Sequence, residues 1–230
     1  VVCLRDHPAA VEVLGGIDPE VFEGRTVVHL SSATPVVARE TAAWAAARGL
    51  DYLSGAILVP TPLVGEPDSL FLYAGQRPLF DAHVEVLRVL GGKADYLGEE
   101  HGLPSLHDVA MLEVFFAGMT AFLHAAAMTT AQGIDAKAFL PYAQDVLGVL
   151  GHSIGDLAAE VDAASHPGTE DNLAMELSAL EHIAHTSREL GLDNRLPDLL
   201  RDVAADAVRA GHGSDGFSRV VEVMRGSLAR

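Results

Sequence analysis

The sequence is poor in cysteine and in basic residues. Its single cysteine, Cys3, rules out a framework of internal disulfides, which is typical of a reducing compartment, so we expect a cytoplasmic protein. Lys and Arg number 15 against 32 Asp and Glu, and the formal net charge is therefore -17. A surface with this excess of negative charge repels nucleic acids and anionic membranes, and we expect neither as a partner.

Glycine, proline and charged residues are scarce between Gly102 and Thr130. After Gly102 and Pro104, Gly118 is the only further Gly or Pro among mostly apolar residues. The run has the length and composition of one long buried helix. It is also long enough to cross a membrane, but Glu113 and His124 lie within it and no basic flank follows. We therefore favour a helix in the interior of a soluble protein.

A helix that is apolar nearly all round must be covered on every side. A chain of 230 residues can do this most easily by packing against a second copy of itself. The composition of this helix thus predicts an obligate oligomer.

Asp108 lies near the start of this run and is the residue to which we give a catalytic, proton-handling role. An ionisable group on so apolar a segment needs a reason to be there. A second interpretation stays open from the residues alone: an Asp in the first turn of a helix interacts favourably with the helix dipole and can cap a free N–H.

The rest of the chain divides into two halves. Up to about residue 100, short apolar strands alternate with helical segments, which is typical of parallel α/β structure. After Gly102 the pattern is helical throughout, with Gly and Pro at each break. The predicted strands are 1–4, 26–30, 51–59, 69–74 and 96–97, and the predicted helices are 8–14, 35–48, 78–90, 105–131, 135–163, 170–190, 197–210 and 215–227.

Two short patterns suggest ligand sites but lack the context that such sites need. Residues 211–216 spell G-x-G-x-x-G, yet a helix precedes them where a dinucleotide phosphate loop requires a strand, so we expect a turn between helices with Gly at positive φ. His182 and His185 stand three residues apart on a predicted helix, without the third ligand that zinc requires. We predict no metal site.

Eight short segments, in this order and spacing, carry a resemblance to a known family. The chain resembles the imine reductases and reductive aminases, within the superfamily of the 6-phosphogluconate and β-hydroxyacid dehydrogenases. The resemblance covers essentially the whole chain. The segments are HLSSATP at 29–35, YLSGAILVP at 52–60, LYAG at 72–75, YLGE at 96–99, LHDVAML at 106–112, FLHA at 122–125, ALEH at 179–182 and AGHG at 210–213.

This resemblance implies an α/β plus all-α fold: a partial Rossmann-type NAD(P)-binding domain over 1–104, with its first βαβ unit absent, then a long interdomain helix and a helical dimerisation domain over 105–230. The helical bundle is expected to form an intertwined homodimer. Val1 is not Met, and the chain looks truncated at its N-terminus. The family's glycine loop would precede Val1, so we expect these residues alone to bind the cofactor weakly or not at all.

The long helix separates the branches of the superfamily. The hydroxyacid dehydrogenases carry a Lys six residues after the Gly that opens this helix and an Asn four residues later, whereas this chain has Asp108 and Leu112 there. An iminium substrate arrives positively charged and is better met by a carboxylate than by a cation. Hydroxyacid enzymes also hold a substrate carboxylate with backbone groups where this chain has Pro60, which offers no N–H. The resemblance therefore implies hydride transfer from NADPH to the C=N bond of a small-molecule imine or iminium, giving an amine.

The resemblance also implies which residues form the site. Asp108 is the catalytic residue. Ser32 stands where some reductive aminases carry an Asn that assists condensation of amine and ketone, and Phe116 stands where some relatives have a Tyr that can bond to substrate. The implied cofactor-binding residues are Leu4, Arg5, Asp6, Ser31, Ser32, Thr34 and Val59, and the implied substrate-pocket residues are Leu112, Phe116, Met175 and Leu180, the last two from the partner subunit.

Two other interpretations stay open at this point. One is a β-hydroxyacid dehydrogenase-like enzyme that has lost its Lys and acts on a 3-hydroxy acid. The other is a non-catalytic dimerising fragment, in which Asp108 has only a structural role.

Overall fold

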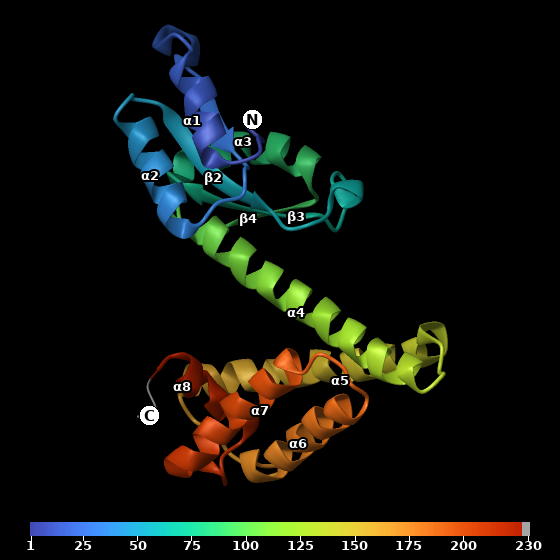
Figure 1. Cartoon of the computed structure of the whole chain (residues 1–230). Helices are drawn as coiled ribbons and strands as arrows, with labels where there is room; N and C mark the ends of the chain where they lie inside the picture. Colours follow the sequence, from blue (N-terminus) through green and yellow to red (C-terminus); the bar gives the residue numbers. More distant parts are fainter. Residues whose placement is uncertain (227–230) are drawn as a thin grey trace. The chain divides into compact units, whose positions relative to one another are not determined.

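The computed structural model describes residues 1–226 (Figure 1). It forms two compact units, Val1–Ala117 and Gly118–Arg230, and the division falls within the long helix α4, Leu103–Ala131. The domain boundary predicted from the sequence, between 104 and 105, lies near the start of this helix. It stays a prediction. Each unit is described by itself below.

The first unit is built on a sheet of strands in the order β1-β2-β3-β4. Its strands are β1 (Thr26–His29), β2 (Asp51–Ile57), β3 (Leu70–Gly75) and β4 (Lys93–Tyr96). The predicted strand at 1–4 is reduced to a single parallel bridge from Val2 to His29, with hydrogen bonds from Val2 N–H to Val28 O and from Leu30 N–H to Val2 O. The chain therefore enters the sheet beside β1.

The expectation of an all-parallel sheet is wrong at its centre. β1 and β2 are parallel and β3 and β4 are parallel, but β2 and β3 are antiparallel, with Ile57 opposite Phe71. A parallel pair needs a crossover connection, which is usually a helix. The connection between β2 and β3 contains only the three-residue helical turn η2, Thr61–Leu63, so the chain reverses instead of crossing over.

Helices cover both faces of this sheet. α3 (Arg77–Leu90) packs on one face, while α1 (His7–Gly15) and α2 (Pro35–Ala46) pack on the other, and η1 (Pro19–Phe22) joins α1 to β1. Adjacent strand residues serve opposite faces because side chains alternate along a strand. Leu53 accordingly packs in the cluster with α3, and Tyr52 in the cluster with α1 and α2.

The α3 face contains a buried polar group that leads to a stability prediction. Tyr73 is 0% exposed, and its hydroxyl has no hydrogen-bond partner among residues 1–226. Burial of an unpaired hydroxyl costs about 1 to 3 kcal/mol, so Tyr73→Phe is expected to raise the free energy of unfolding by about 1 kcal/mol. Urea denaturation measures this change.

The matched control for this prediction is Tyr96→Phe, because the Tyr96 hydroxyl donates to the Gly75 carbonyl at 2.8 Å. Loss of that bond is expected to lower the free energy of unfolding by about 1 kcal/mol. Equal destabilisation by both substitutions would contradict the prediction.

The second unit is helical. After the end of α4 it contains α5 (Ala136–Ala163), α6 (Leu173–Glu189), α7 (Arg195–Ala207), the π-helical turn η3 (Val208–His212), η4 (Phe217–Arg219) and α8 (Val220–Met224). Its core is formed by α6, α7 and α8 and contains Leu173, Ala204, Ala207 and Val220. The helical segments predicted from the sequence are confirmed to within a few residues, except that the last one is divided into η4 and α8 and its final residue, 227, lies outside the described part.

The two short patterns noted in the sequence lie in this unit. Gly211 has φ of 96° and follows helical residues, so the G-x-G-x-x-G string forms the expected turn and not a phosphate loop. His185 pairs with Glu189 at 3.2 Å. Among residues 1–226, no group of three or more potential ligands is arranged to hold a metal ion.

In the single chain the long helix is largely exposed, and its burial by a second copy stays a prediction. Along α4, Val114 is 70% exposed and Leu123 is 65% exposed, and α5 presents Val146 and Val149 in the same way. By length and composition α4 could also cross a membrane, since its most apolar stretch has a mean hydropathy of 1.6, a test that core helices of soluble proteins also pass. The apolar surface predicted from the sequence is present, and the chain by itself does not cover it.

Candidate active site

The candidate site lies in the first unit, where three chain segments leave one edge of the sheet. The bridge at Val2 and the strands β1 and β2 run parallel, so the segments 3–6, 30–34 and 58–60 all follow carboxyl ends of strands. The Leu4 N–H donates to Ser31 Oγ at 2.9 Å and links the first two segments. Open α/β sheets bind their ligands at this edge.

The segment 30–34 leads directly into α2. Thr34 caps this helix, and its hydroxyl accepts a hydrogen bond from the Val37 N–H at 3.4 Å, which confirms that at least one of these hydroxyls has a capping role. Ser31 is buried, whereas Ser32 is exposed. Free N–H groups at a helix N-terminus attract polar and anionic ligand groups, so the edge is suited to the polar part of a cofactor.

Asp108 is brought to this edge by α4. The first turn of α4 holds Leu103, Pro104, Ser105 and Leu106, so Asp108 lies beyond it and does not have the first-turn position that the capping interpretation requires. The residue is only 5% exposed. Burial raises the pKa of the Asp108 carboxyl above its ordinary value, and a hydrogen bond from the Ser32 side chain partly offsets that rise.

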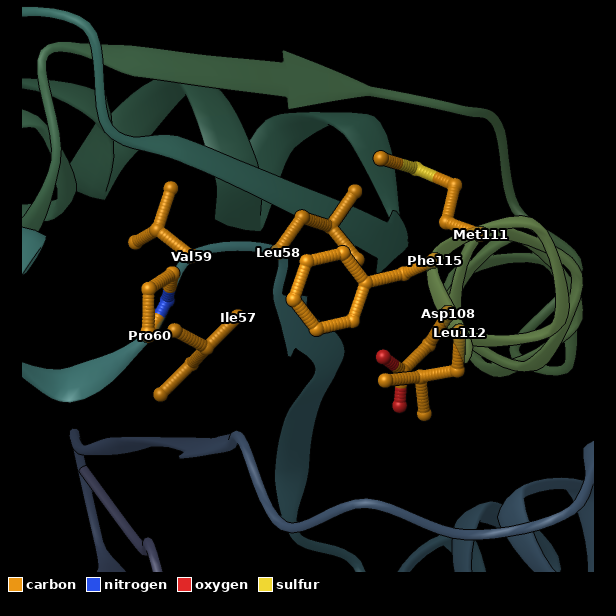
Figure 2. Close-up of a pocket in the computed structure, with 8 residues that line it drawn as sticks. All are labelled: Ile57, Leu58, Val59, Pro60, Asp108, Met111, Leu112 and Phe115. Atoms are coloured by element: carbon orange, nitrogen blue, oxygen red, sulfur yellow. The ribbon is translucent and has the colours of Figure 1, made fainter. Parts of the chain in front are cut away.

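A cavity of about 340 Å³ lies between α4 and the segment that follows β2. Figure 2 shows side chains from these two elements facing each other across it. Of the eight described residues that line it, Asp108 alone is ionisable, so a single carboxylate faces an apolar space. The lining residues are Ile57, Leu58, Val59, Pro60, Asp108, Met111, Leu112 and Phe115.

The helical residues of the cavity follow Asp108 at intervals of three, four and seven. At about 100° per residue, a side chain seven positions on points within about 20° of the first, whereas one eight positions on points about 80° away. Phe115, at the seventh position, therefore lines the cavity. Phe116 lies outside the lining, with its ring centroid 5.7 Å from that of Phe115, and its role in substrate binding stays a prediction.

The structure brings several predicted site residues together and separates others. Val59 and Leu112 line the cavity, and Ser32 contacts Asp108. Met175 and Leu180 belong to the second unit, and the cavity is formed without them. Met175 is exposed at the start of α6, whereas Leu180 packs against the core of its own unit.

The three residues predicted from the segment 3–6 also have local roles. The Asp6 carboxylate accepts from the Ala9 N–H at 2.9 Å and caps α1, and Arg5 pairs with Asp6 at 2.8 Å on the surface. Leu4 holds Ser31 through its N–H. These contacts fix the segment beside the edge and leave its part in cofactor binding a prediction.

Sequence reasoning placed Pro60 beside the substrate through the resemblance but missed four of the lining residues. Met111 and Phe115 could have been found from their helical spacing to Asp108. Ile57 and Leu58 lie some 50 positions before it, and only the fold shows that they form the opposite wall.

The sequence matches one family model and one characterised relative. Residues 100–226 match the sequence model of the family described as "NADPH-dependent reductive aminase-like, C-terminal domain". An NADPH-dependent reductive aminase of Aspergillus oryzae is 26% identical over 233 residues, which cover 98% of this chain and 77% of that protein.

Solved structures give the same result over nearly the whole chain. An imine reductase of Streptomyces aurantiacus is 36% identical, with a TM-score of 0.89 over 96% of this chain and 77% of that one. A reductive aminase of Aspergillus terreus, solved in complex with NADPH4, cyclohexanone and allyl amine, is 33% identical, with a TM-score of 0.89 over 97% of this chain and 77% of that one.

Proposed function

Because this chain belongs to the NADPH-dependent reductive aminase-like family, together with the imine reductases, we propose that it reduces the C=N bond of a small-molecule imine or iminium to an amine. The observation that carries this proposal is the position of Asp108: one buried carboxylate in an otherwise apolar cavity, beside the strand ends that receive a cofactor.

The edge of the sheet fits the cofactor, NADPH. The hydroxyls of Ser31, Ser32 and Thr34 and the N-terminus of α2 lie together there, and the Leu4–Ser31 hydrogen bond holds the segment 3–6 beside them. NADPH supplies the hydride when it is bound. We propose that Leu4, Arg5, Asp6 and Val59 complete the cofactor-facing surface.

Asp108 orients the substrate by charge. Its carboxylate attracts the positive nitrogen of an iminium, and the apolar walls make this interaction stronger than it is in water. The raised pKa, caused by burial, also brings the carboxyl closer to the range in which it can hand on a proton. The residue thus holds the C=N bond and can relay the proton that the amine receives.

The cavity walls indicate what the substrate carries. Pro60 has no N–H, so this segment cannot hold a substrate carboxylate with a backbone donor at that position. The Ser32 side chain, shorter than the Asn of some relatives, is already bonded to Asp108. We propose that preformed apolar imines are used in preference to a ketone and an amine that must first condense, with Phe116 shaping the pocket next to Phe115.

We propose that the active form is an intertwined homodimer and that Met175 and Leu180 face the substrate of the partner subunit. The exposed apolar residues of α4 and α5 support a second copy of the chain as the cover. The net charge of -17 argues against an anionic membrane or a nucleic acid as the cover, because both would be repelled. A cytoplasmic location is part of the same proposal.

The test of this function uses two substrates. Because these residues alone are expected to bind the cofactor weakly, NADPH is supplied in large excess. With a cyclic imine such as a pyrroline, we then expect consumption of NADPH and formation of the cyclic amine. With NADP⁺ and a 3-hydroxy acid we expect no turnover, because the cavity lacks the Lys of the hydroxyacid enzymes among its described lining residues. Turnover of the hydroxy acid alone would support the dehydrogenase interpretation and overturn the proposal.

A binding measurement distinguishes a protein that does not catalyse the reaction from one that does not bind NADPH. NADPH fluorescence, titrated with the protein, reports cofactor binding without any turnover. Bound NADPH with neither substrate consumed would support the non-catalytic interpretation.

A further inference from the structure

Ser31, in the segment between β1 and α2, is held by two hydrogen bonds. Its hydroxyl accepts from the Leu4 N–H, and its carbonyl lies 2.9 Å from Nε2 of His7, the first residue of α1. The other ring nitrogen of His7, Nδ1, lies 2.9 Å from Thr41 Oγ1 of α2. The ring of His7 thus links α1, α2 and the segment that contains Ser31. His7 is only 3% exposed, so these contacts lie in the interior of the first unit.

The partners of His7 fix which nitrogen carries a proton. A carbonyl oxygen can only accept, so Nε2 must be protonated and must donate to Ser31 O. Burial lowers the pKa of His7, and the charge of Asp6, the N-cap of α1, acts in the opposite direction. The ring centroid of His29 in β1 is 4.0 Å from that of His7. Burial lowers the pKa of His29 to about 4, so the ring tilted against His7 is neutral near neutral pH.

The residue after Ser31 is the one that contacts the catalytic carboxylate. Ser32 is exposed, and its side chain hydrogen-bonds to Asp108. An exposed serine keeps one orientation only if its backbone is held, and here the anchors are Ser31 on one side and the capping residue Thr34 on the other. The position of the Ser32 hydroxyl therefore depends on the bonds that hold Ser31.

We propose that His7 is a positioning residue for the reaction: its Nε2–H holds the Ser31 carbonyl and thereby keeps the Ser32 hydroxyl on the carboxylate of Asp108. His7 lies outside the cavity and acts on it through two backbone-linked residues. The role in catalysis rests on the function proposed above, whereas the structural linkage from His7 to Asp108 does not.

The experiment measures the titration of the Asp108 carboxyl directly, in the chain as it exists. Aspartate labelled with ¹³C at the side-chain carboxyl gives one NMR signal for each Asp, and the signal lost in Asp108→Asn identifies Asp108. Its chemical shift is followed against pH in the wild type, in Ser32→Ala and in variants of His7.

Two variants of His7 separate the hydrogen bond from the packing of the ring. His7→Phe keeps an aromatic ring and has no donor, so it releases the Ser31 carbonyl. His7→Gln keeps an amide N–H at the reach of Nε2 and is expected to restore the bond. If His7→Phe fails to fold, His7→Asn, whose amide is too short for that carbonyl, takes its place.

The expected result is an upward shift of the Asp108 midpoint in Ser32→Ala and in His7→Phe, because a hydrogen bond to the carboxylate lowers the pKa of its acid. His7→Gln is expected to titrate as the wild type does. In the double variant, His7→Phe is expected to add nothing to the effect of Ser32→Ala, since both act on one bond. In turnover, kcat/KM of His7→Phe is expected to fall about tenfold, with its acid limb moved to higher pH.

The matched control is His83→Phe, which, like His7→Phe, keeps an aromatic ring and removes the hydrogen bond of a ring nitrogen. His83 Nε2 also bonds to a threonine hydroxyl at 2.9 Å, that of Thr26, on the α3 side of the same sheet. This variant is expected to leave the Asp108 midpoint and kcat/KM unchanged. An unshifted midpoint in His7→Phe, or a shift of equal size in the Ser32→Ala background, would overturn the proposal. A shifted midpoint without imine turnover would leave the positioning intact and refute the proposed function instead.

Discussion

Asp108→Asn is expected to lower kcat for the reduction of a cyclic imine by about 10²- to 10⁴-fold, the range typical of removing a group that acts on charge or protons in the transition state. Asn is nearly isosteric, so the cavity keeps its shape and loses only the negative charge. The uncharged amide cannot attract an iminium nitrogen across apolar walls. Steady-state kinetics with saturating NADPH measure the effect.

The control for this substitution is Glu113→Gln, which removes the same charge from the same helix. Glu113 follows Asp108 by five residues, about 140° round the helix, and is exposed. We expect kcat within about twofold of the wild type, because an exposed charge is screened by solvent. Similar losses in both variants would show that the net charge of α4, and not the carboxylate in the cavity, is what matters.

Asp108→Asn also has a predicted effect on the free energy of unfolding, and the sign of this effect follows from the pKa shift of Asp108. Burial raises the folded-state pKa of Asp108 above its unfolded value, so the folded state binds the proton more readily. The protonated acid therefore adds stability at low pH, and this contribution is lost as the pH rises through the folded-state pKa. At neutral pH, Asp108→Asn is expected not to lower the free energy of unfolding. A clear loss of stability would favour a structural role.

The proposed dimer leads to the second large effect. Leu123→Glu in α4 and Val149→Glu in α5 each place a carboxylate on the exposed apolar surface that we expect the second copy to cover. Burial of an unpaired charge costs about 4 kcal/mol, which weakens association about thousandfold. At micromolar concentration, analytical ultracentrifugation is expected to show a dimer for the wild type and a monomer for each variant.

Val89→Glu is the matched control for the dimer. Val89 is as exposed as these residues but belongs to α3 and not to either of the two long helices. The control is expected to sediment as the wild type does. A monomeric wild type, or dimers in both long-helix variants, would exclude the proposed interface.

The sequence predicted those features that depend on local chemistry. Pro35 and the Gly residues near 91, 133 and 191 mark helix ends because their backbone preferences act wherever the residue stands. The Thr34 hydroxyl caps the helix that begins at Pro35, as expected of a hydroxyl at that place. These are properties of neighbours in sequence, and the structure confirms them.

What the sequence did not predict depends on contacts between distant segments. The direction of β3 is invisible to periodicity, because a strand has the same alternation in either direction. The wall formed by Ile57 and Leu58 meets α4 only through the fold of the sheet. The exposure of α4 likewise depends on which segments pack against it. Its sequence predicts an apolar surface but does not say what covers that surface.

The reversal between β2 and β3 also affects how this protein could acquire new substrates. A helical crossover has to span the sheet, so its length is fixed, but a loop that reverses the chain can grow or shrink at small entropic cost. Residues 58–69 form such a loop, and its first three residues are a wall of the cavity. Variation in this loop can reshape the space beside Asp108 while the register of the sheet stays as it is. We therefore expect substitutions, insertions and deletions in residues 58–69 to change which imines the protein accepts.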